Sequence, residues 1–475
     1  MLKKKLYTVD EASNLSIKEV QNLYREFINP NQTKIYASLP FGNDIFDRAE
    51  GVFIYTSEGK KILDFTGGLG VLGLGHNHPR IINARLAFQQ KNKIEVHKII
   101  FSKYMAALSS SISSLLSENL TKSFFLNSGA EAVEAAIKVS YKSFDGEKKN
   151  ILYSNKSYHG KLIGSGSVSG SYKINNQFPS MNNCFDFEFN NADDLEKKVE
   201  NYHKDGGVYA IIIEPYSASL LESCSDKFIK KLFVLKKKYN FKIIFDEVFT
   251  GFFKSKKMFY YQNFDNISPD IICLSKTLGG GKSSISCLVI DDETYSEAYG
   301  GLSDTFLHTT TYNGFGEESV TALESLNIIS EVKFKIQVEL LSSLLSKKLI
   351  ELKDKYPNKI EIIKGNGILN GIIFKSYSTA LAKLVETIPL KFIKDKSYFL
   401  KKLTATAISC ELYEKYGILT SINDAAGSNH LCVSPSLIIN EENVEYFFNS
   451  LEKVLQTNLN LKSLEVIFNF LKSKS

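Results

Sequence analysis

Tryptophan is absent from this chain of 475 residues, and arginine occurs only four times. The arginines are Arg25, Arg48, Arg80 and Arg85, so every strongly basic side chain after position 85 is a lysine. Lysine is a point charge that cannot reproduce the planar, two-pronged contact of arginine with a carboxylate. The sequence therefore excludes an arginine clamp for a substrate carboxylate anywhere beyond residue 85.

Long apolar runs and a secretory leader are also missing. No segment reaches the about 20 apolar residues that span a membrane. The start, MLKKKLYTVDEAS, has no apolar core after its lysines. The six cysteines show neither CxxC nor zinc-ligand spacing. We therefore expect a cytoplasmic protein with reduced thiols, without a membrane partner and without a metal site.

The formal net charge of +6 comes with short lysine runs that alternate with acidic residues. Lys236 to Lys238 is one such run. This pattern is typical of a solvated surface, whereas a nucleic-acid interface would need a basic stripe with ordered aromatic residues. We therefore expect no nucleic-acid partner.

Strand-like and helix-like patterns alternate along most of the chain. Residues 1–60 are predicted to form an N-terminal arm and part of a small domain, residues 61–329 a large domain, and residues 330–475 a C-terminal small domain. Apolar strand-like runs occur at residues 209–213, 242–245, 271–274 and 285–290. A hairpin is predicted around Ser57 to Gly59, and a long helical stretch at about Gly316 to Tyr356. The alternation predicts an α/β fold, with a mostly parallel central sheet that has helices on both faces and a smaller α+β domain.

The most informative segment is IICLSKTLGGGKSSIS, residues 271–286. Its apolar start predicts a buried strand that leads Lys276 into a glycine-rich turn. A lysine at the mouth of a buried strand is desolvated, which lowers its pKa and makes the amine available for a Schiff base. The GGGKSS run is not a P-loop, because Lys276 stands where that motif requires its first glycine. The alternative for Lys276 is a structural lysine at a strand end.

A second apolar run, FKIIFDEV at residues 241–248, ends in the carboxylates of Asp246 and Glu247. It precedes Lys276 by the length of one strand, one connection and another strand. We therefore expect Asp246 and Lys276 to face one pocket from neighbouring strand ends. The alternative for Asp246, a surface carboxylate, conflicts with the apolar character of FKIIF.

A third signal is a helix start at Ser128, Gly129 and Ala130, within NSGAEAVEAAIK. Free backbone N–H groups and the helix dipole at such a start hold a phosphate. The alternative is a plain N-terminal cap by Asn127 or Ser128.

These three segments, together with SYHG at residues 157–160, resemble the class III aminotransferases, which use pyridoxal 5'-phosphate (PLP) on the type I fold. The resemblance extends from about Gly51 to Leu455 and is strongest to the putrescine and ornithine/acetylornithine branch. Further matching segments follow in the same order, namely LHTTTYNG, GNGILNG and SPSLIIN. The resemblance implies a type I PLP-dependent transferase fold in which the large domain binds PLP, and small-molecule amine and carbonyl substrates.

The resemblance also implies roles for individual residues. Lys276 would form the Schiff base, and Asp246 would pair with the pyridine nitrogen and keep it protonated. Val248 and Tyr158 would pack on opposite faces of the cofactor ring. Glu214 would hold a hydrogen-bond network at the floor of the pocket.

Three more roles concern the surroundings of the cofactor. His159 would either support the stacked Tyr158 or simply fill the core. Thr311, with Thr310 beside it, would reach across a homodimer to the phosphate bound by the other subunit. The alternative is that both threonines belong to an ordinary hydroxyl-rich loop.

The chain departs from the family at three positions. Phe249 stands where many members have a glutamine near the phenolic oxygen of the cofactor. Ser219, in EPYSAS, replaces a glutamate, and Cys432 replaces the substrate-binding arginine with which that glutamate pairs. We therefore expect at least one substrate without a carboxylate beside the reacting carbon. The alternative is that Lys254, Arg80 or another cation binds the carboxylate from a different wall.

The predicted function is that of a homodimeric PLP-dependent aminotransferase, which moves an amino group between an amine or amino acid and a carbonyl acceptor. An aminomutase or a phospholyase is the alternative within PLP chemistry, because both use the same lysine and aspartate on this fold. The alternative from another class is a non-catalytic PLP-binding scaffold protein, against which the presence of Lys276 and Asp246 argues.

Overall fold

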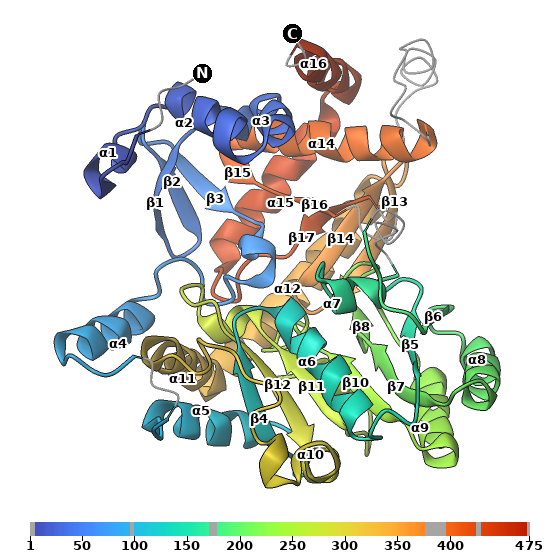
Figure 1. Ribbon diagram of the computed structural model, residues 1–475. Coiled ribbons are helices and arrows are strands. Elements are labelled where there is room, and N and C mark those ends of the chain that lie inside the picture. Colours follow the sequence, from blue (N-terminus) through green and yellow to red (C-terminus); the bar gives the residue numbers. More distant parts are fainter. Residues whose placement is uncertain (1–4, 96–98, 171–177, 376–395, 424–428, 473–475) are drawn as a thin grey trace.

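The computed structural model describes residues 5–95, 99–170, 178–375, 396–423 and 429–472 (Figure 1). Within these ranges, no helix combines the length and the apolar composition of a membrane span. All six cysteines are described, and each is a free thiol.

A seven-stranded sheet forms the centre of the protein. In spatial order its strands are β4 (Leu120–Leu126), β12 (Ser286–Asp291), β11 (Ile271–Leu274), β10 (Lys242–Asp246), β7 (Val208–Ile213), β5 (Asn150–Ser154) and β6 (Cys184–Phe187). Strand β12 runs antiparallel to both of its neighbours, β4 and β11, and the other four pairings in the sheet are parallel. The connection of residues 275–285 is too short for a crossover helix, so it reverses the chain after β11. The predicted mostly parallel sheet is confirmed.

Helices cover both faces of this sheet, as predicted. Along β10, Ile244 packs in one apolar layer and Ile243 and Phe245 pack in the other, because successive side chains of a strand point to opposite faces. Helix α6 (Gly129–Lys142) supplies alanines and Val133 to the layer around Ile244, and Figure 1 shows it in front of the sheet. Residues of α8 (Ala192–Lys204) and α9 (Asp226–Tyr239) belong to the other layer.

Two further sheets lie outside the central one. The first has the order β1 (Phe46–Glu50), β2 (Phe53–Thr56), β3 (Lys61–Asp64), β15 (Ile418–Leu419), and the second has the order β13 (Ile360–Asn366), β14 (Leu369–Phe374), β17 (His430–Val433), β16 (Ile422–Asn423). Strands β2 and β3 pair antiparallel and so confirm the predicted hairpin. The domain boundaries at residues 60 and 329 stay predictions. The antiparallel pairing of β2 with β3 is a contact across the first boundary, and the parallel pairing of β3 with β15 is a contact across the second.

The remaining elements of the described residues are the following. The helices are α1 (Val9–Ser13), α2 (Ile17–Leu23), α3 (Pro30–Ala37), α4 (Pro79–Gln90), α5 (Lys103–Ser113), α7 (Ile163–Ser167), α10 (Asp292–Tyr299), α11 (Gly316–Ser330), α12 (Val332–Lys355), α14 (Lys396–Tyr416), α15 (Glu441–Gln456) and α16 (Leu459–Lys472). Short turns are η1 (Tyr24–Ile28), η2 (Pro40–Asn43), η3 (Gly67–Gly70), η5 (Tyr260–Asn263), η6 (Lys276–Gly279) and η7 (Leu302–Asp304), and a small ribbon pairs β8 (Tyr216–Ser217) with β9 (Glu222–Ser223).

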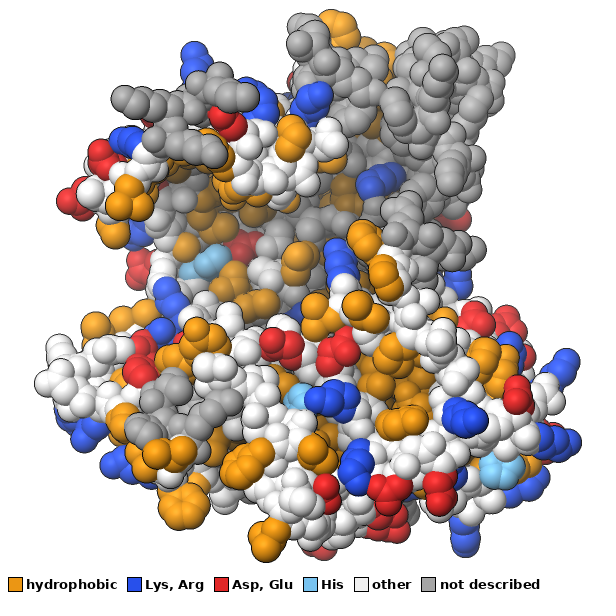
Figure 2. Space-filling view, in the orientation of Figure 1, with side chains coloured by type: hydrophobic (Ala, Val, Ile, Leu, Met, Phe, Trp, Pro, Cys, Tyr) orange, Lys and Arg blue, Asp and Glu red, His pale blue; other side chains and the backbone are white. Residues whose placement is uncertain are grey.

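The predicted helical stretch over residues 316–356 is confirmed as helical. It consists of two helices, because Glu331 has an extended backbone with ψ 138° that ends α11 and begins α12. Figure 2 shows that the surface on this side is recessed between an upper part, built on β1–β3 and C-terminal elements, and a lower part, built on the central sheet.

Candidate active site

Strands β10 and β11 bring Asp246 and Lys276 to the same edge of the central sheet. The two strands are parallel neighbours, with Asp246 opposite Cys273, and Lys276 follows shortly after β11 ends. Lys276 has a left-handed backbone with φ +52°, a conformation that costs a residue with a side chain roughly 1–2 kcal/mol. Strain of this kind is typical of functional sites.

The Lys276 side chain lies in a buried and electrostatically mixed environment. Burial lowers the pKa of Lys276 to about 8, against the opposing effect of the nearby carboxylates of Asp246 and Glu214. Its Nζ lies 3.9 Å from the centroid of the Phe249 ring, which faces the amine as a cation–π partner. An amine with a lowered pKa is partly unprotonated near neutral pH and can attack a carbonyl carbon.

Asp246 is buried and held by two hydrogen bonds. Its Oδ2 lies 2.7 Å from Nδ1 of His159, and its Oδ1 accepts from the backbone N–H of Val248 at 2.9 Å. This contact joins the His159 imidazole to the Asp246 carboxylate. The two roles left open for His159, support of the stacked Tyr158 or filling of the core, stay predictions. The other ring nitrogen of His159 is buried and has no hydrogen-bond partner among the described residues.

Glu214, directly after β7, connects the floor of the site to its wall. Its Oε2 accepts from the backbone N–H of Tyr158 at 3.1 Å, and its Oε1 accepts from the backbone N–H of Ala218 at 3.2 Å. Burial raises the pKa of Glu214 to about 7, an effect that His159 opposes and Asp246 reinforces. Glu214 therefore fixes the backbone of the predicted ring-stacking residue Tyr158, whose side chain is partly exposed.

The N-terminus of α6 lies against the same cluster. Ser128 caps the helix, and the N–H groups of Asn127 and Ser128 donate to Glu131 at 2.8 and 2.9 Å. The next amides, those of Gly129 and Ala130, have no acceptor within the helix. The N-terminal cap by Ser128, which the sequence offered as the alternative to a phosphate site, is therefore present. It does not use the N–H groups of Gly129 and Ala130, so these two groups can still bind an anion.

Close packing at two glycines joins these segments. A Cβ at Gly129 would lie 2.6 Å from Cγ1 of Val248, and a Cβ at Gly160 would lie 2.7 Å from Cβ of Ala130. Only glycine at these positions lets the helix start approach both the Val248 loop and the SYHG turn. Ser128 to Ala130, Tyr158, His159, Glu214, Asp246, Val248 and Lys276 thus lie in one cluster.

Thr310 and Thr311 have no described contact with this cluster. The side chain of Thr311 is exposed, and the Oγ1 of Thr310 is buried without a hydrogen-bond partner among the described residues. The loop is tied to α6 by His308, whose Nδ1 lies 3.1 Å from Nζ of Lys138. The roles of both threonines stay predictions.

The positions that depart from the family lie on strands and turns near the Glu214 segment. Cys432, on β17, pairs with Gly371 of β14, and burial raises the pKa of its thiol. A Cβ at Gly371 would lie 2.7 Å from Leu221, so β14 packs against the turn that follows the buried Ser219. The side-chain amide of Asn423, on β16, donates to the carbonyl of Ala218 at 3.4 Å in the same turn.

The two cations considered as substitutes for the missing arginine have other partners. Arg80 contacts Glu324 at 2.6 Å and also pairs with Glu331. Lys254 is buried, with only 1% of its surface exposed, and its Nζ donates to the carbonyl of Gly70 at 2.9 Å. Gly70 and Thr277, which also contacts this carbonyl, were not predicted from the sequence. The glycine-rich GGLG run at residues 67–70 was the sequence signal for Gly70, and the position directly after Lys276 was the signal for Thr277.

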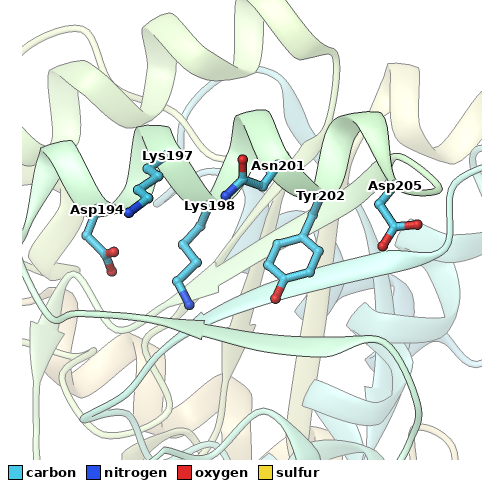
Figure 3. Close-up of a pocket in the computed structure, with 6 residues that line it drawn as sticks. All are labelled: Asp194, Lys197, Lys198, Asn201, Tyr202 and Asp205. Atoms are coloured by element: carbon cyan, nitrogen blue, oxygen red, sulfur yellow. The ribbon is translucent and has the colours of Figure 1, made fainter.

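A separate surface hollow lies along α8 (Figure 3). Its lining residues are Asp194, Lys197, Lys198, Asn201, Tyr202 and Asp205. It contains none of the predicted site residues.

Comparison with known proteins identifies the family. The aminotransferase class-III family matches residues 41–455. An acetylornithine/succinyldiaminopimelate aminotransferase of Buchnera aphidicola subsp. Acyrthosiphon pisum (strain APS) is 30% identical over 431 residues, which cover 89% of this chain and 94% of that protein.

Solved structures show the same fold. The adenosylmethionine-8-amino-7-oxononanoate aminotransferase from Methanocaldococcus jannaschii DSM 2661 superimposes with a TM-score of 0.77 at 24% identity, covering 92% of this chain and 98% of that one. The omega transaminase from Pseudomonas jessenii, in complex with PMP, has a TM-score of 0.73 at 23% identity, with coverages of 87% and 92%. The chain belongs to the aminotransferase class-III family, whose members depend on PLP, and is a transaminase.

Proposed function

We propose that this transaminase holds PLP in the cluster around Lys276 and Asp246, with the phosphate at the start of α6. The observation that carries the proposal is the buried Lys276 amine, whose pKa is lowered to about 8, at the strand end next to Asp246. When bound, PLP supplies an electron sink that stabilises negative charge on the reacting carbon of the substrate.

The residues present fit this cofactor. Each oxygen of Asp246 makes one hydrogen bond to the protein, and a carboxylate oxygen can accept two. Each oxygen therefore keeps one position that can accept from a protonated ring nitrogen. The free amides of Gly129 and Ala130 fit a phosphate, and the packing of Gly129 on Val248 places the two subsites side by side.

Each residue has a distinct task in this proposal. Lys276 would hold the cofactor through its amine and, with that amine free, would move the proton at the reacting carbon of the substrate. Asp246, oriented by His159, holds the proton on the ring nitrogen. Glu214 keeps Tyr158 in place as one face of the ring site, and Val248 forms the other.

The proposed substrate class rests on the neutral residues Cys432 and Ser219, which stand where the resemblance places an arginine–glutamate pair; we refer to these two positions as the neutral wall. With Arg80 paired to two glutamates and Lys254 bonded to Gly70, neither cation has its charge directed at a substrate carboxylate. We propose that at least one substrate lacks a carboxylate beside the reacting carbon. A diamine, an amino alcohol, an amino sugar or a larger carbonyl compound meets this condition.

We further propose a homodimer that works in the cytoplasm. The loop of Thr310 and Thr311 exposes large apolar side chains, among them Phe306 at 78% and Tyr312 at 57%. A second copy of the chain would cover such side chains and receive Thr311 at its phosphate site. Six free thiols, four of them buried, suit a reducing compartment.

The test begins with the cofactor itself. Purified protein incubated with PLP is reduced with borohydride, digested and analysed by mass spectrometry, and the cofactor mass is expected on the peptide that contains Lys276. Half-reactions with a panel of amines and amino acids, followed by the absorbance of the bound cofactor, then report the donor class. Cofactor attached to another lysine, or to none, contradicts the proposed site.

A further inference from the structure

Lys254 is a buried lysine that the steps above do not use. It is 1% exposed, and within the described ranges it forms no ion pair, since its one hydrogen bond runs to the carbonyl of Gly70. A buried amine without a carboxylate partner is unfavourable for folding. A contribution to folding stability therefore does not explain why a lysine lies at this position beside the active site.

The backbone directly before Lys254 is strained. Phe252 and Phe253 both have left-handed backbones, with φ of 66° and 64°, and each costs roughly 1–2 kcal/mol. The Lys254 carbonyl accepts from the N–H of Ile368 at 3.0 Å, in the turn between β13 and β14. Lys254 is thus fixed at its backbone by the C-terminal sheet and at its amine by Gly70.

The Gly70 carbonyl is a meeting point of three segments. It accepts from Nζ of Lys254 at 2.9 Å and from Oγ1 of Thr277 at 3.1 Å. Thr277 directly follows Lys276, and its own carbonyl accepts from Ser325 at 2.9 Å. One carbonyl group therefore links the loop of residues 67–70, the chain after β10, and the strained turn of the reactive lysine.

Phe249 lies inside this arrangement. Its ring centroid is 3.9 Å from Nζ of Lys276 and 5.4 Å from Nζ of Lys254. A Cβ at Gly70 would lie 3.0 Å from Cε2 of the same ring, so the loop packs directly on Phe249. If the loop of residues 67–70 moved, the Phe249 ring would lose its packing against Gly70, and Thr277 would lose its hydrogen bond to the Gly70 carbonyl.

We propose that Lys254 is a positioning residue of the transamination site: through Gly70 it holds the 67–70 loop and the Phe249 ring against Lys276. The inference rests on the proposed role of Lys276 as the reactive amine. It differs from that role because Lys254 acts through its neighbours and touches neither cofactor nor substrate.

The charge of Lys254 fits this task. Burial and the nearby Lys276 amine lower the pKa of Lys254 well below its usual value, against the opposing effect of Glu247. The lowered pKa favours the neutral amine, which still donates to Gly70 and adds less positive charge next to Lys276, which otherwise faces Asp246 and Glu214. Arginine in the same place would keep the donor but carry a permanent charge.

The test compares Lys254→Met, Lys254→Arg and Thr277→Val with the wild type. Lys254→Met and Thr277→Val each remove one donor to Gly70 and are expected to lower kcat about 10- to 100-fold with a smaller change in KM, as a misplaced reacting group does. Their effects should not add in the double variant, since both donors act on one carbonyl. Lys254→Arg should recover most of kcat and shift the pH titration of the bound-cofactor absorbance to lower pH.

Lys242→Met is the matched control, because Lys242 is also buried, pairs with Glu297 at 2.6 Å, and lies at the opposite end of β10 from Asp246. It should leave kcat within about twofold of the wild type. Kinetics of Lys254→Met equal to the wild type, an equal loss in Lys242→Met, or no recovery in Lys254→Arg would each overturn the inference. If Lys254→Met does not fold, the kcat values of Lys254→Arg and Thr277→Val test the inference in its place. A wild type that neither transaminates nor attaches cofactor to Lys276 overturns the proposed function instead.

Discussion

The reactive lysine is expected to destabilise the fold that carries it. Burial lowers the pKa of Lys276 from 10.5 to about 8, and a difference of about 2.5 between these values corresponds to roughly 3 kcal/mol. Lys276→Met keeps the length and packing of the side chain without the charge. We therefore predict that cofactor-free Lys276→Met protein is more stable to unfolding than the wild type at neutral pH, by about 2–4 kcal/mol.

The stability difference between Lys276→Met and the wild type should depend on pH. Below about pH 8 the lysine is protonated in both the folded and the unfolded chain, so the full penalty applies. Between about 8 and 10.5 the unfolded chain holds a proton that the folded chain has released, so wild-type stability rises with pH. The advantage of Lys276→Met should therefore shrink across this window and vanish above it.

The assay is urea unfolding of cofactor-free protein at equal concentrations, at neutral pH and at several values up to about 10.5. Removal of the cofactor matters, because any ligand that binds the folded state adds stability of its own. Lys242→Met is the control, since it loses an ion pair with Glu297 and should gain nothing. A Lys276→Met variant that is less stable at pH 7, or whose advantage does not change with pH, would refute the reasoning.

Three further predictions concern activity. Asp246→Asn should keep the fold and lose several orders of magnitude in kcat, because an amide does not hold the ring proton; near-normal steady-state rates would move that role to another group. Mixed dimers of Lys276→Ala and Thr311→Ala chains should regain activity, since one of their two sites receives both intact residues. Lack of recovery in a sample shown by mass spectrometry to exchange subunits would exclude the shared site. With Ser219 and Cys432 in place of an ion pair, α-amino acids should bind about 30- to several-thousand-fold more weakly than an arginine clamp would allow, as expected for the roughly 2–5 kcal/mol of a lost buried pair. Half-reactions should thus favour diamines over α-amino acids of matched length, and a clear preference for the amino acids would contradict the neutral wall.

The sequence was sufficient for the elements whose pattern is local. The apolar runs before Asp246 and Lys276 predicted β10 and β11, because a fully buried strand must be apolar on both faces. The helix start at Gly129 was equally clear from its cap and its alanines. The break at Glu331 was not located from the sequence, because no glycine or proline marks it between the two flanking helices.

Contacts between distant segments could not be predicted in this way. The bond between His159 and Asp246 joins residues far apart in sequence, so this contact of His159 was not predicted. Gly70 and Lys254 were missed as a pair for the same reason. A left-handed backbone at Phe252 and Phe253 is also invisible in the sequence, since phenylalanine does not favour it.

The pairing of β3 with β15 has a consequence for the order in which the chain folds. Residues 418–419 leave the ribosome long after residues 61–64, so during synthesis β3 lacks its outer neighbour while the central sheet is already complete in sequence. An unpaired strand edge is a template for pairing with other chains. Nascent or truncated chains that end before Ile418 should therefore aggregate through β3, and chaperones that shield this edge should raise the yield of folded protein.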